Sequence, residues 1–237
     1  MHELAVPMPS RQLEAYHRVL SLKEHVKKYS TLEMIQSLRQ VSLHPVLYES
    51  SFNDEPLQIE DSSRFIALLR ILDEISKKDE KVLIFLESLD LQSSNQLPLL
   101  LQRRYGLQRL PMVINGQVKT EERQRQVNLF QKENGFDVMI LSPKAGGVGL
   151  TLTAANHVVH LSRWWNPAVE DQATDRAHRI GQENTVQVIK LITKGTIEEK
   201  IFQLQAQKKE MIDKVIQEGE TLITKLSEEE LMSLFED

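Results

Sequence analysis

The chain has no cysteine, which excludes a disulfide framework and a thiolate metal site. It also has no apolar run close to the roughly 20 residues that a helix needs to cross a bilayer. The N-terminus does not combine a basic region with an apolar core, so it does not resemble a secretory signal. We therefore expect a cytoplasmic protein with no membrane partner.

Basic residues are also fewer than acidic residues. The chain has 29 Lys and Arg against 34 Asp and Glu, a net charge of −5. This balance argues against binding nucleic acid through bulk charge, although a local basic groove remains compatible with it. The 237 residues are 41% hydrophobic and 27% charged, as expected for a globular protein of one or two domains.

Two signatures of nucleotide hydrolysis are missing. The sequence has no Gly-Lys-Ser/Thr loop to cradle ATP and no Asp-Glu-x-His box to hold magnesium. A glycine-rich stretch does occur at residues 145–150, but it lacks the dinucleotide pattern Gly-x-Gly-x-x-Gly. Glycine-rich turns after strands are common because tight turns need positive φ. The functional alternative is close approach of the backbone to a phosphate of nucleic acid or nucleotide.

Strands and helices alternate from Lys81 onward. Residues 82–86 are wholly apolar, as expected of a parallel strand covered on both faces. The same reasoning predicts further strands at 110–114, 137–141, 158–161 and 186–192. Helices are expected between them at 91–105 and 120–131, and Pro98 marks an alternative start for the first. This alternation predicts an α/β domain with a mainly parallel sheet flanked by helices.

Helices are also predicted at both ends of the chain. The ranges are 10–29 with Ser10 as its cap, 31–43, 62–76, 196–217 after a capping box at Thr196, and an acidic helix after a second box at Ser227. His44, before a proline, is interpreted as a structural side chain. We expect three segments: a helical lead-in at 1–60, the α/β lobe at 61–218 and an acidic tail helix at 219–237.

Several polar turns follow predicted strands. Asn115 and Gly116 come after one strand, residues 142–149 after the next, and residues 162–166 after another. Because ligands gather at the carboxyl ends of parallel strands, we expect these turns to line one edge of the sheet.

A helix is predicted from Asn166 and Pro167 to Gly181. Asn166 suits the N-cap, and Pro167 suits the first helical position. A buried stripe is expected at Val169, Ala173, Ala177 and Ile180. A different side carries Gln172, Arg176 and Arg179. From spacing alone the two arginines fit a solvated face, whereas the alternative is a polyphosphate site, since guanidinium groups make multi-donor contacts to phosphate.

Three stretches in this order resemble helicase motifs V and VI of the Swi/Snf family of superfamily-two DNA translocases. They are residues 145–150, the run Trp-Trp-Asn-Pro at 164–167, and Gln-Ala-x-x-Arg-x-x-Arg-Ile-Gly-Gln at 172–182. The resemblance implies the second RecA-like lobe of a two-lobed ATP-driven motor, without the P-loop itself. It also implies that Arg176 and Arg179 are arginine fingers on an open surface, and that the ATP contacts include Gly147, Gly149 and Gln172.

The resemblance also implies contacts to double-stranded DNA. It assigns them to Asn115, Gly116, Arg123, Ser142, Lys144, Arg163 and Trp164. The alternatives are a surface arginine at Arg123 and core positions for the tryptophans. The sequence departs from the family where Thr151 replaces the usual asparagine and where Ser162 replaces a frequent acidic residue.

The resemblance finally implies ATP and Mg²⁺ as cofactors in a full-length protein, with Mg²⁺ held by a first lobe that this chain lacks. Its partners would be double-stranded DNA and that first lobe, and the chain alone would be inactive. Translocation or chromatin-remodelling-like activity is expected rather than strand separation, with nucleoid association if the source is bacterial. The rivals are a non-catalytic α/β module that binds protein or nucleic acid, and an unrelated nucleotide-binding enzyme.

Overall fold

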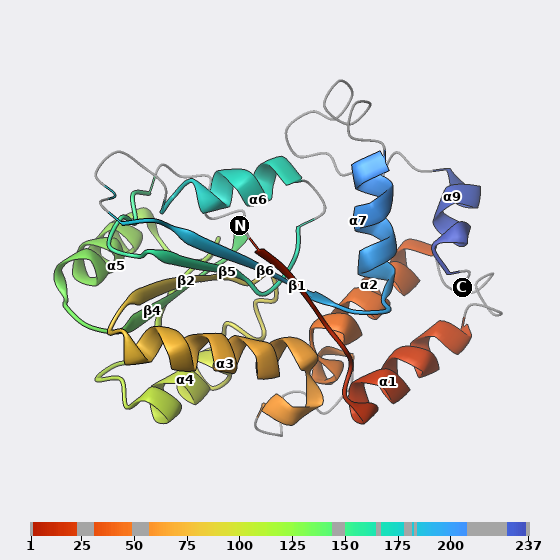
Figure 1. The fold of residues 1–237 in the computed structure, drawn as a ribbon, viewed down its shortest axis with the longest axis horizontal. Helices are drawn as coiled ribbons and strands as arrows, with labels where there is room; N and C mark the ends of the chain where they lie inside the picture. The colour runs from red at the N-terminus through yellow and green to blue at the C-terminus, as the bar shows by residue number, and fades with distance from the viewer. Residues whose placement is uncertain are drawn as a thin grey trace. The chain divides into compact units, whose positions relative to one another are not determined.

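A computed structural model describes eight stretches of the chain. They are residues 2–22, 31–48, 57–143, 150–164, 167–177, 182, 184–207 and 227–235. Figure 1 shows the chain coloured by residue number. The chain divides into two compact units. The sheet unit comprises Met1–Leu4 and Ala67–Leu191, and the helical unit comprises Ala5–Ile66 and Ile192–Asp237.

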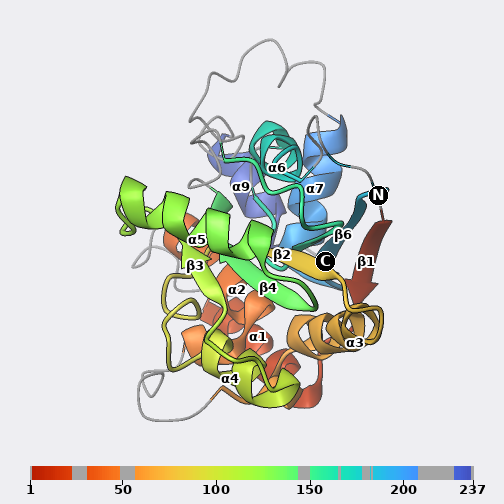
Figure 2. The same cartoon turned by 90° about the vertical axis from the view of Figure 1, so that its left-hand side faces the viewer.

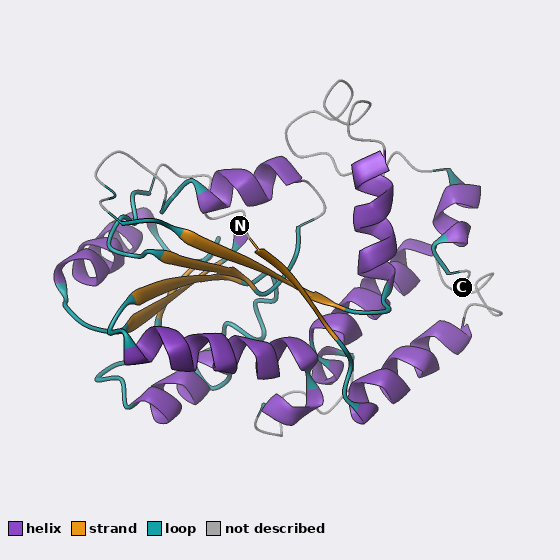
Figure 3. Cartoon of the chain, viewed as in Figure 1, coloured by secondary structure: helices purple, strands orange, loops and turns teal. Residues whose placement is uncertain are grey.

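A six-stranded sheet has the order β1-β6-β5-β2-β4-β3. Its strands are β1 (His2–Val6), β2 (Lys81–Phe85), β3 (Met112–Ile114), β4 (Asp137–Leu141), β5 (His157–His160) and β6 (Gln187–Thr193). The pairs β2/β4, β2/β5, β3/β4 and β5/β6 are all parallel, which confirms the predicted parallel sheet. Figure 2 shows β3 and β1 at opposite edges, and Figure 3 sets the strands apart from the helices by colour.

The central strands β2, β4 and β5 are buried along their whole length, because helices cover both faces. On one face, Leu83, Phe85 and Met139 form a core cluster with Phe130 of α5 (Thr120–Lys132) and Ala173 of α6 (Pro167–Thr174). The opposite face is covered by α3 (Ser63–Lys77) and α4 (Leu97–Tyr105) (Figure 1). This two-sided covering is why the strands read as continuous apolar runs.

The predicted boundaries of the strands, of α3 and of α5 hold to within one or two residues, and a choice left open at α4 is resolved. Helix α4 begins at Leu97, with Pro98 in its first turn, so the later of the two starts is correct. It ends at Gly106, whose φ of 62° is left-handed. Most of the predicted strands begin or end one or two residues from their observed limits.

The helical unit contains α1 (Ser10–Leu20), α2 (Thr31–Leu43), α7 (Ile197–Gln207) and α9 (Glu228–Ser233), with 3₁₀ turns at Pro45–Leu47 and Ile59–Asp61. The N-cap of α1 is Pro9 and makes no side-chain bond, so the prediction of a Ser10 cap is wrong. The capping box at Ser227 is confirmed.

At α7 the predicted box does not form. Glu199 accepts from the Gly195 N–H at 2.7 Å, and the Thr196 hydroxyl donates to the Thr193 carbonyl at 2.8 Å. The predicted continuations of the helices through 23–29 and 208–217 lie outside the described residues.

His44 is a structural side chain, as predicted. It is 1% exposed, its Nδ1 accepts from the Val46 N–H at 3.2 Å, and its ring packs edge-on against Phe65. The division into segments 1–60, 61–218 and 219–237 stays a prediction. Within the described residues, no helix has the length and apolar character needed to span a membrane.

Candidate functional site at the carboxyl edge of the sheet

The residues that follow β2, β4 and β5 are each bonded through the backbone to the last residue of a neighbouring strand. Ser142 N–H, after β4, donates to the Ile114 carbonyl of β3 at 2.9 Å. Leu86 N–H, after β2, donates to Leu141 of β4 at 2.9 Å. Ser162 N–H, after β5, donates to Phe85 of β2 at 3.2 Å. Asn115, Ser142 and Ser162 therefore lie at the same carboxyl edge, which confirms the predicted arrangement.

The turn at residues 115–118 is held by side chains on both sides. Asn115 Nδ2 donates to Gln92 Oε1 at 2.9 Å, and Asn115 Oδ1 accepts from the Gln117 N–H at 2.9 Å. Arg123 donates through Nε to the Val118 carbonyl at 2.7 Å and through Nη2 to the Asn115 carbonyl at 3.0 Å. Arg123 thus fixes the turn that carries Asn115 and Gly116. Because these bonds occupy part of its guanidinium, Arg123 is not a free surface arginine, and only the rest of the group is available to a ligand.

Sequence reasoning missed Gln92. This side chain is 3% exposed, and its Nε2 donates to the Leu86 carbonyl at 2.7 Å while its Oε1 accepts from Asn115. It therefore ties the turn after β2 to the turn after β3. A cavity of about 480 Å³ opens beside Gln92, Ser94, Asn115 and Gln117. No local pattern marks Gln92, because its partner Asn115 is 23 residues away in the sequence.

Residues 162–164 form the turn after β5. Ser162 Oγ accepts from the Glu87 N–H at 3.1 Å. Arg163 is 7% exposed and donates through Nε to Glu170 at 2.9 Å and through Nη1 to Glu3 at 2.7 Å. Trp164 is half-buried, and its N–H donates to Glu170 at 2.7 Å. The Arg163 guanidinium is thus bound to two carboxylates, while Trp165 and Asn166 lie outside the described residues.

Helix α6 is shorter than predicted. It carries Gln172, which is exposed, but ends at Thr174, so placing Arg176 on the helix is wrong. The reason is that Arg176 N–H and Ala177 N–H bond three residues back, to Ala173 and Thr174, which tightens the chain into a turn. Ala173 and Ala177 are buried, as predicted for the apolar stripe.

Arg176 is 3% exposed, so the expectation of an open surface is wrong for this residue. Its carbonyl accepts from the Leu152 N–H at 3.0 Å, which joins the turn to the end of the glycine-rich stretch. Arg179 and Gly181 lie outside the described residues, as do Lys144, Gly147 and Gly149. Ser142 and Leu150, which border the glycine-rich stretch, are both buried.

Two ionisable groups near this edge are strongly influenced by their surroundings. Burial raises the pKa of Glu170, but Arg163, His160 and Lys190 outweigh it, so the pKa lies below its usual value and the carboxylate is charged. Burial lowers the pKa of His160 to about 4, and its ring stacks on Phe85 and bonds Thr174 Oγ1 at 2.9 Å. Among the described residues, no group of three or more His, Cys, Asp and Glu could hold a metal ion.

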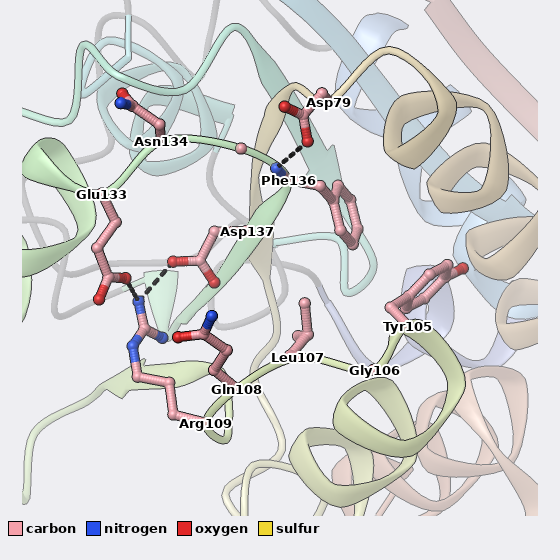
Figure 4. Close-up of a pocket in the computed structure, with 11 residues that line it drawn as sticks. Asp79, Tyr105, Gly106, Leu107, Gln108, Arg109, Glu133, Asn134, Phe136 and Asp137 are labelled. Atoms are coloured by element: carbon pink, nitrogen blue, oxygen red, sulfur yellow. Dashed lines mark hydrogen bonds and ion pairs between the residues drawn. The ribbon is translucent and has the colours of Figure 1, made fainter.

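A separate cavity lies at the opposite, amino edge of the sheet (Figure 4). It measures about 630 Å³ and is lined by the turns that precede β2, β3 and β4. Arg109 bridges Glu133 at 2.5 Å and Asp137 at 2.6 Å, and Asp79 accepts from the Phe136 N–H at 2.9 Å. These bonds hold the turns together, and none of the predicted site residues lines this cavity.

A family model described as "Helicase conserved C-terminal domain" matches residues 63–181. The YwqA protein of Bacillus subtilis (strain 168), whose name describes an ATP-dependent helicase/translocase, is 41% identical over 238 residues. That match covers 97% of this chain and 25% of YwqA. The chain therefore spans about a quarter of the length of this curated relative.

Solved structures give the same result. The Sulfolobus solfataricus SWI2/SNF2 ATPase C-terminal domain is 28% identical, with a TM-score of 0.77 over 99% of this chain and 97% of that one. The ATPase core of the same protein, in a structure described as a complex with dsDNA, is 29% identical with a TM-score of 0.79. That match covers 99% of this chain and 49% of the core.

Proposed function

Because this chain belongs to the helicase conserved C-terminal domain family and forms the C-terminal lobe of a SWI2/SNF2-type ATPase, we propose that it works with a first lobe as an ATP-dependent translocase on double-stranded DNA. The observation that carries this proposal is the carboxyl edge, where hydrogen bonds hold together the ends of four parallel strands and the turns that follow them. In parallel α/β sheets, ligands bind at this edge.

For ATP, this chain has phosphate-contacting groups but no complete site. Gln172 is exposed on α6, and the glycines 147 and 149 follow β4 in the sequence. ATP, when bound, would supply the phosphoryl group that passes to water. Gln172, Gly147 and Gly149 would contact it, and Arg176 and Arg179 would stabilise the negative charge that develops. Because Arg176 is nearly buried, its contact requires the side chain to move when the first lobe docks.

Magnesium is proposed to come with the first lobe. The described residues offer no cluster of three or more carboxylates or histidines, and the sequence has no Asp-Glu-x-His box. Oxygen ligands from carboxylates are what Mg²⁺ prefers. The part of the chain that the structure describes therefore offers no site of its own for the metal.

The DNA contact is proposed at Asn115, Gly116, Ser142 and Lys144, with Arg123 shaping the turn. A relative's structure is described as a complex with dsDNA, and this chain matches it over 99% of its length. At Gly116 an added Cβ would meet nothing within 4 Å, so the backbone is open to close approach. Phosphate contacts of this kind set position without reading sequence. We further propose translocation or remodelling in the cytoplasm, without strand separation.

The test is ATP hydrolysis by the full-length protein, with and without duplex DNA. We expect DNA to raise the rate, and Arg176→Ala or Arg179→Ala to abolish hydrolysis. Arg125→Ala is the matched control, since Arg125 is 78% exposed and pairs with Glu122 on its own helix. Because Arg176 is buried, its replacement by alanine could unfold the protein. The milder variant Arg176→Lys is therefore measured as well, and the melting temperature of each variant is determined.

Three results would contradict parts of the proposal. If the Arg176 and Arg179 variants melt normally and hydrolyse ATP at the wild-type rate, the arginine-finger assignment is wrong. If duplex DNA does not raise the rate of ATP hydrolysis, the proposed DNA contact is wrong. A well-folded full-length protein with no hydrolysis at all would favour the rival, a non-catalytic module that binds protein or nucleic acid.

A further inference from the structure

The carboxylate of Glu170 on α6 is buried, yet it accepts from three donors on other segments of the sheet unit. Glu170 is 2% exposed. Its Oε1 accepts from Arg163 Nε at 2.9 Å and from the Trp164 N–H at 2.7 Å. Its Oε2 lies 3.0 Å from Lys190 Nζ of β6. One helix side chain therefore binds the turn after β5 and the neighbouring strand at once.

The charges around Glu170 nearly balance. Arg163 also binds Glu3 of β1 at 2.7 Å, and Lys190 also lies 3.5 Å from Asp171. Two cations are thus matched by three carboxylates from two elements of the sheet unit, α6 and β1. A buried ion pair contributes little net stability, whereas removing one partner leaves an uncompensated charge. Such a cluster is better suited to fixing geometry than to raising stability.

Glu170 is connected onward to the segment that carries Arg176. Its carbonyl accepts from Thr174 Oγ1 at 3.0 Å, and Thr174 in turn bonds His160 of β5. The chain then turns at residues 175–177, where the Arg176 carbonyl accepts from the Leu152 N–H. Hydrogen bonds therefore connect Trp164, through α6, to the turn at Arg176 and to Leu152, just after the glycine-rich stretch.

We propose that Glu170 is a positioning residue: it locks residues 162–164 to α6, so that DNA bound at the carboxyl edge sets the position of Gln172 and Arg176. Arg163 acts through Glu170 and not by touching phosphate, since its guanidinium is 7% exposed and binds two carboxylates. This inference rests on the proposed function. It adds that one buried carboxylate carries the mechanical link between the DNA contact and the ATP-facing segment.

The variant that isolates the charge is Glu170→Gln. A glutamine has the same shape and can still accept from the Trp164 N–H, but it leaves Arg163 and Lys190 with less countercharge. The matched control is Asp171→Asn, one residue further along α6, where the side chain is 68% exposed. Arg163→Lys is the second variant, since it keeps the positive charge and loses the Nε donor, and it serves if Glu170→Gln does not fold.

The measurement is the ratio of DNA-stimulated to basal ATP hydrolysis in the full-length protein, together with the DNA concentration that gives half-maximal stimulation. We expect Glu170→Gln to lower the ratio about tenfold, with a smaller effect on the basal rate. Arg163→Lys should lower the ratio in the same direction, while its salt dependence of DNA binding stays that of the wild type. Asp171→Asn should leave the ratio unchanged.

The inference is overturned if Glu170→Gln lowers basal and stimulated rates by the same factor, because a purely structural role predicts an unchanged ratio. Its second part is overturned if Arg163→Lys or Arg163→Ala reduces the salt dependence of DNA binding, which is the signature of a lost phosphate contact. If the wild-type protein shows no DNA stimulation, the proposed function fails and the inference falls with it. These results differ from one another, so the two failures are distinguishable.

Discussion

Two glycines at turns of the sheet unit have opposite requirements. Gly106 ends α4 with a φ of 62°, a conformation that side chains with a Cβ rarely adopt. Gly116 has no positive φ, and an added Cβ would meet nothing within 4 Å. The fold therefore needs glycine at Gly106 but not at Gly116, where the absence of a side chain instead leaves the backbone open to a ligand.

We expect Gly106→Ala to lower the free energy of unfolding by about 1 kcal/mol, because alanine is strained in the left-handed region. Gly116→Ala should change it by a few tenths at most, yet raise the DNA concentration needed for half-maximal ATPase stimulation. Urea unfolding and an ATPase titration measure the two effects. An equal loss of stability in both variants would contradict the distinction.

His160 gives the protein a pH-dependent stability. Burial lowers its folded pKa to about 4, whereas the unfolded value is about 6.5. The unfolded chain therefore binds the proton first, and the contribution is present in full above pH 6.5 and is lost as the pH falls toward 4. The loss is about 3 kcal/mol. Urea unfolding between pH 7 and 4 should show a flatter dependence for His160→Gln, and equal slopes would refute the assignment.

At the scale of elements, a buried ion pair joins the first turn of α3, which belongs to the helical unit, to α7. Arg64 and Glu198 have side chains 0% and 5% exposed. Arg64 Nε also donates to Thr193 Oγ1 of β6 at 3.0 Å, and that hydroxyl donates to the Ser42 carbonyl of α2 at 2.7 Å. One arginine therefore ties together segments from both ends of the chain.

Removing either partner alone, as in Arg64→Met or Glu198→Leu, should cost about 3–5 kcal/mol, because the other charge stays buried. The double variant Arg64→Met with Glu198→Leu should cost less than either single one. The exposed pair Arg11–Asp61 is the control, and its removal should cost about 1 kcal/mol or less. If the two single variants' losses of unfolding free energy add up to the loss in the double variant, Arg64 and Glu198 do not act as a pair.

For the whole molecule, the net charge of −5 limits how DNA can be held. Bulk attraction is unfavourable, so binding must come from a few local phosphate contacts. Lys144 is the cation proposed among them. We expect Lys144→Ala to reduce the slope of log K against log salt by about 1, as the loss of one phosphate contact predicts.

The control for Lys144 is Lys77→Ala, since Lys77 is 69% exposed and pairs with Glu74 on α3. Its loss should leave the salt slope unchanged. Duplex binding measured by fluorescence anisotropy at several salt concentrations gives both slopes. If the slope falls equally in the two variants, DNA binding depends on the overall charge of the protein and not on a contact at Lys144.

The sequence by itself determined the layered architecture and the family. Apolar runs of strand length alternating with helical patterns require a parallel sheet covered on both faces, since no other arrangement buries such strands. Gly106 set the end of α4 through backbone sterics, whereas the choice between its two possible starts was left to the structure. The turns after the strands had to meet at one edge, because parallel strands all end on the same side.

The tertiary structure alone decided how the site's side chains are used. Arg163 meets Glu3 across 160 residues, and Asn115 meets Gln92 across 23, so neither contact leaves a periodic trace. The end of α6 at Thr174 and the burial of Arg176 depend on the Leu152 bond and on the packing of Ala173 and Ala177. Spacing along a chain constrains only local geometry, whereas the partner of a buried charge is chosen by what folding brings next to it.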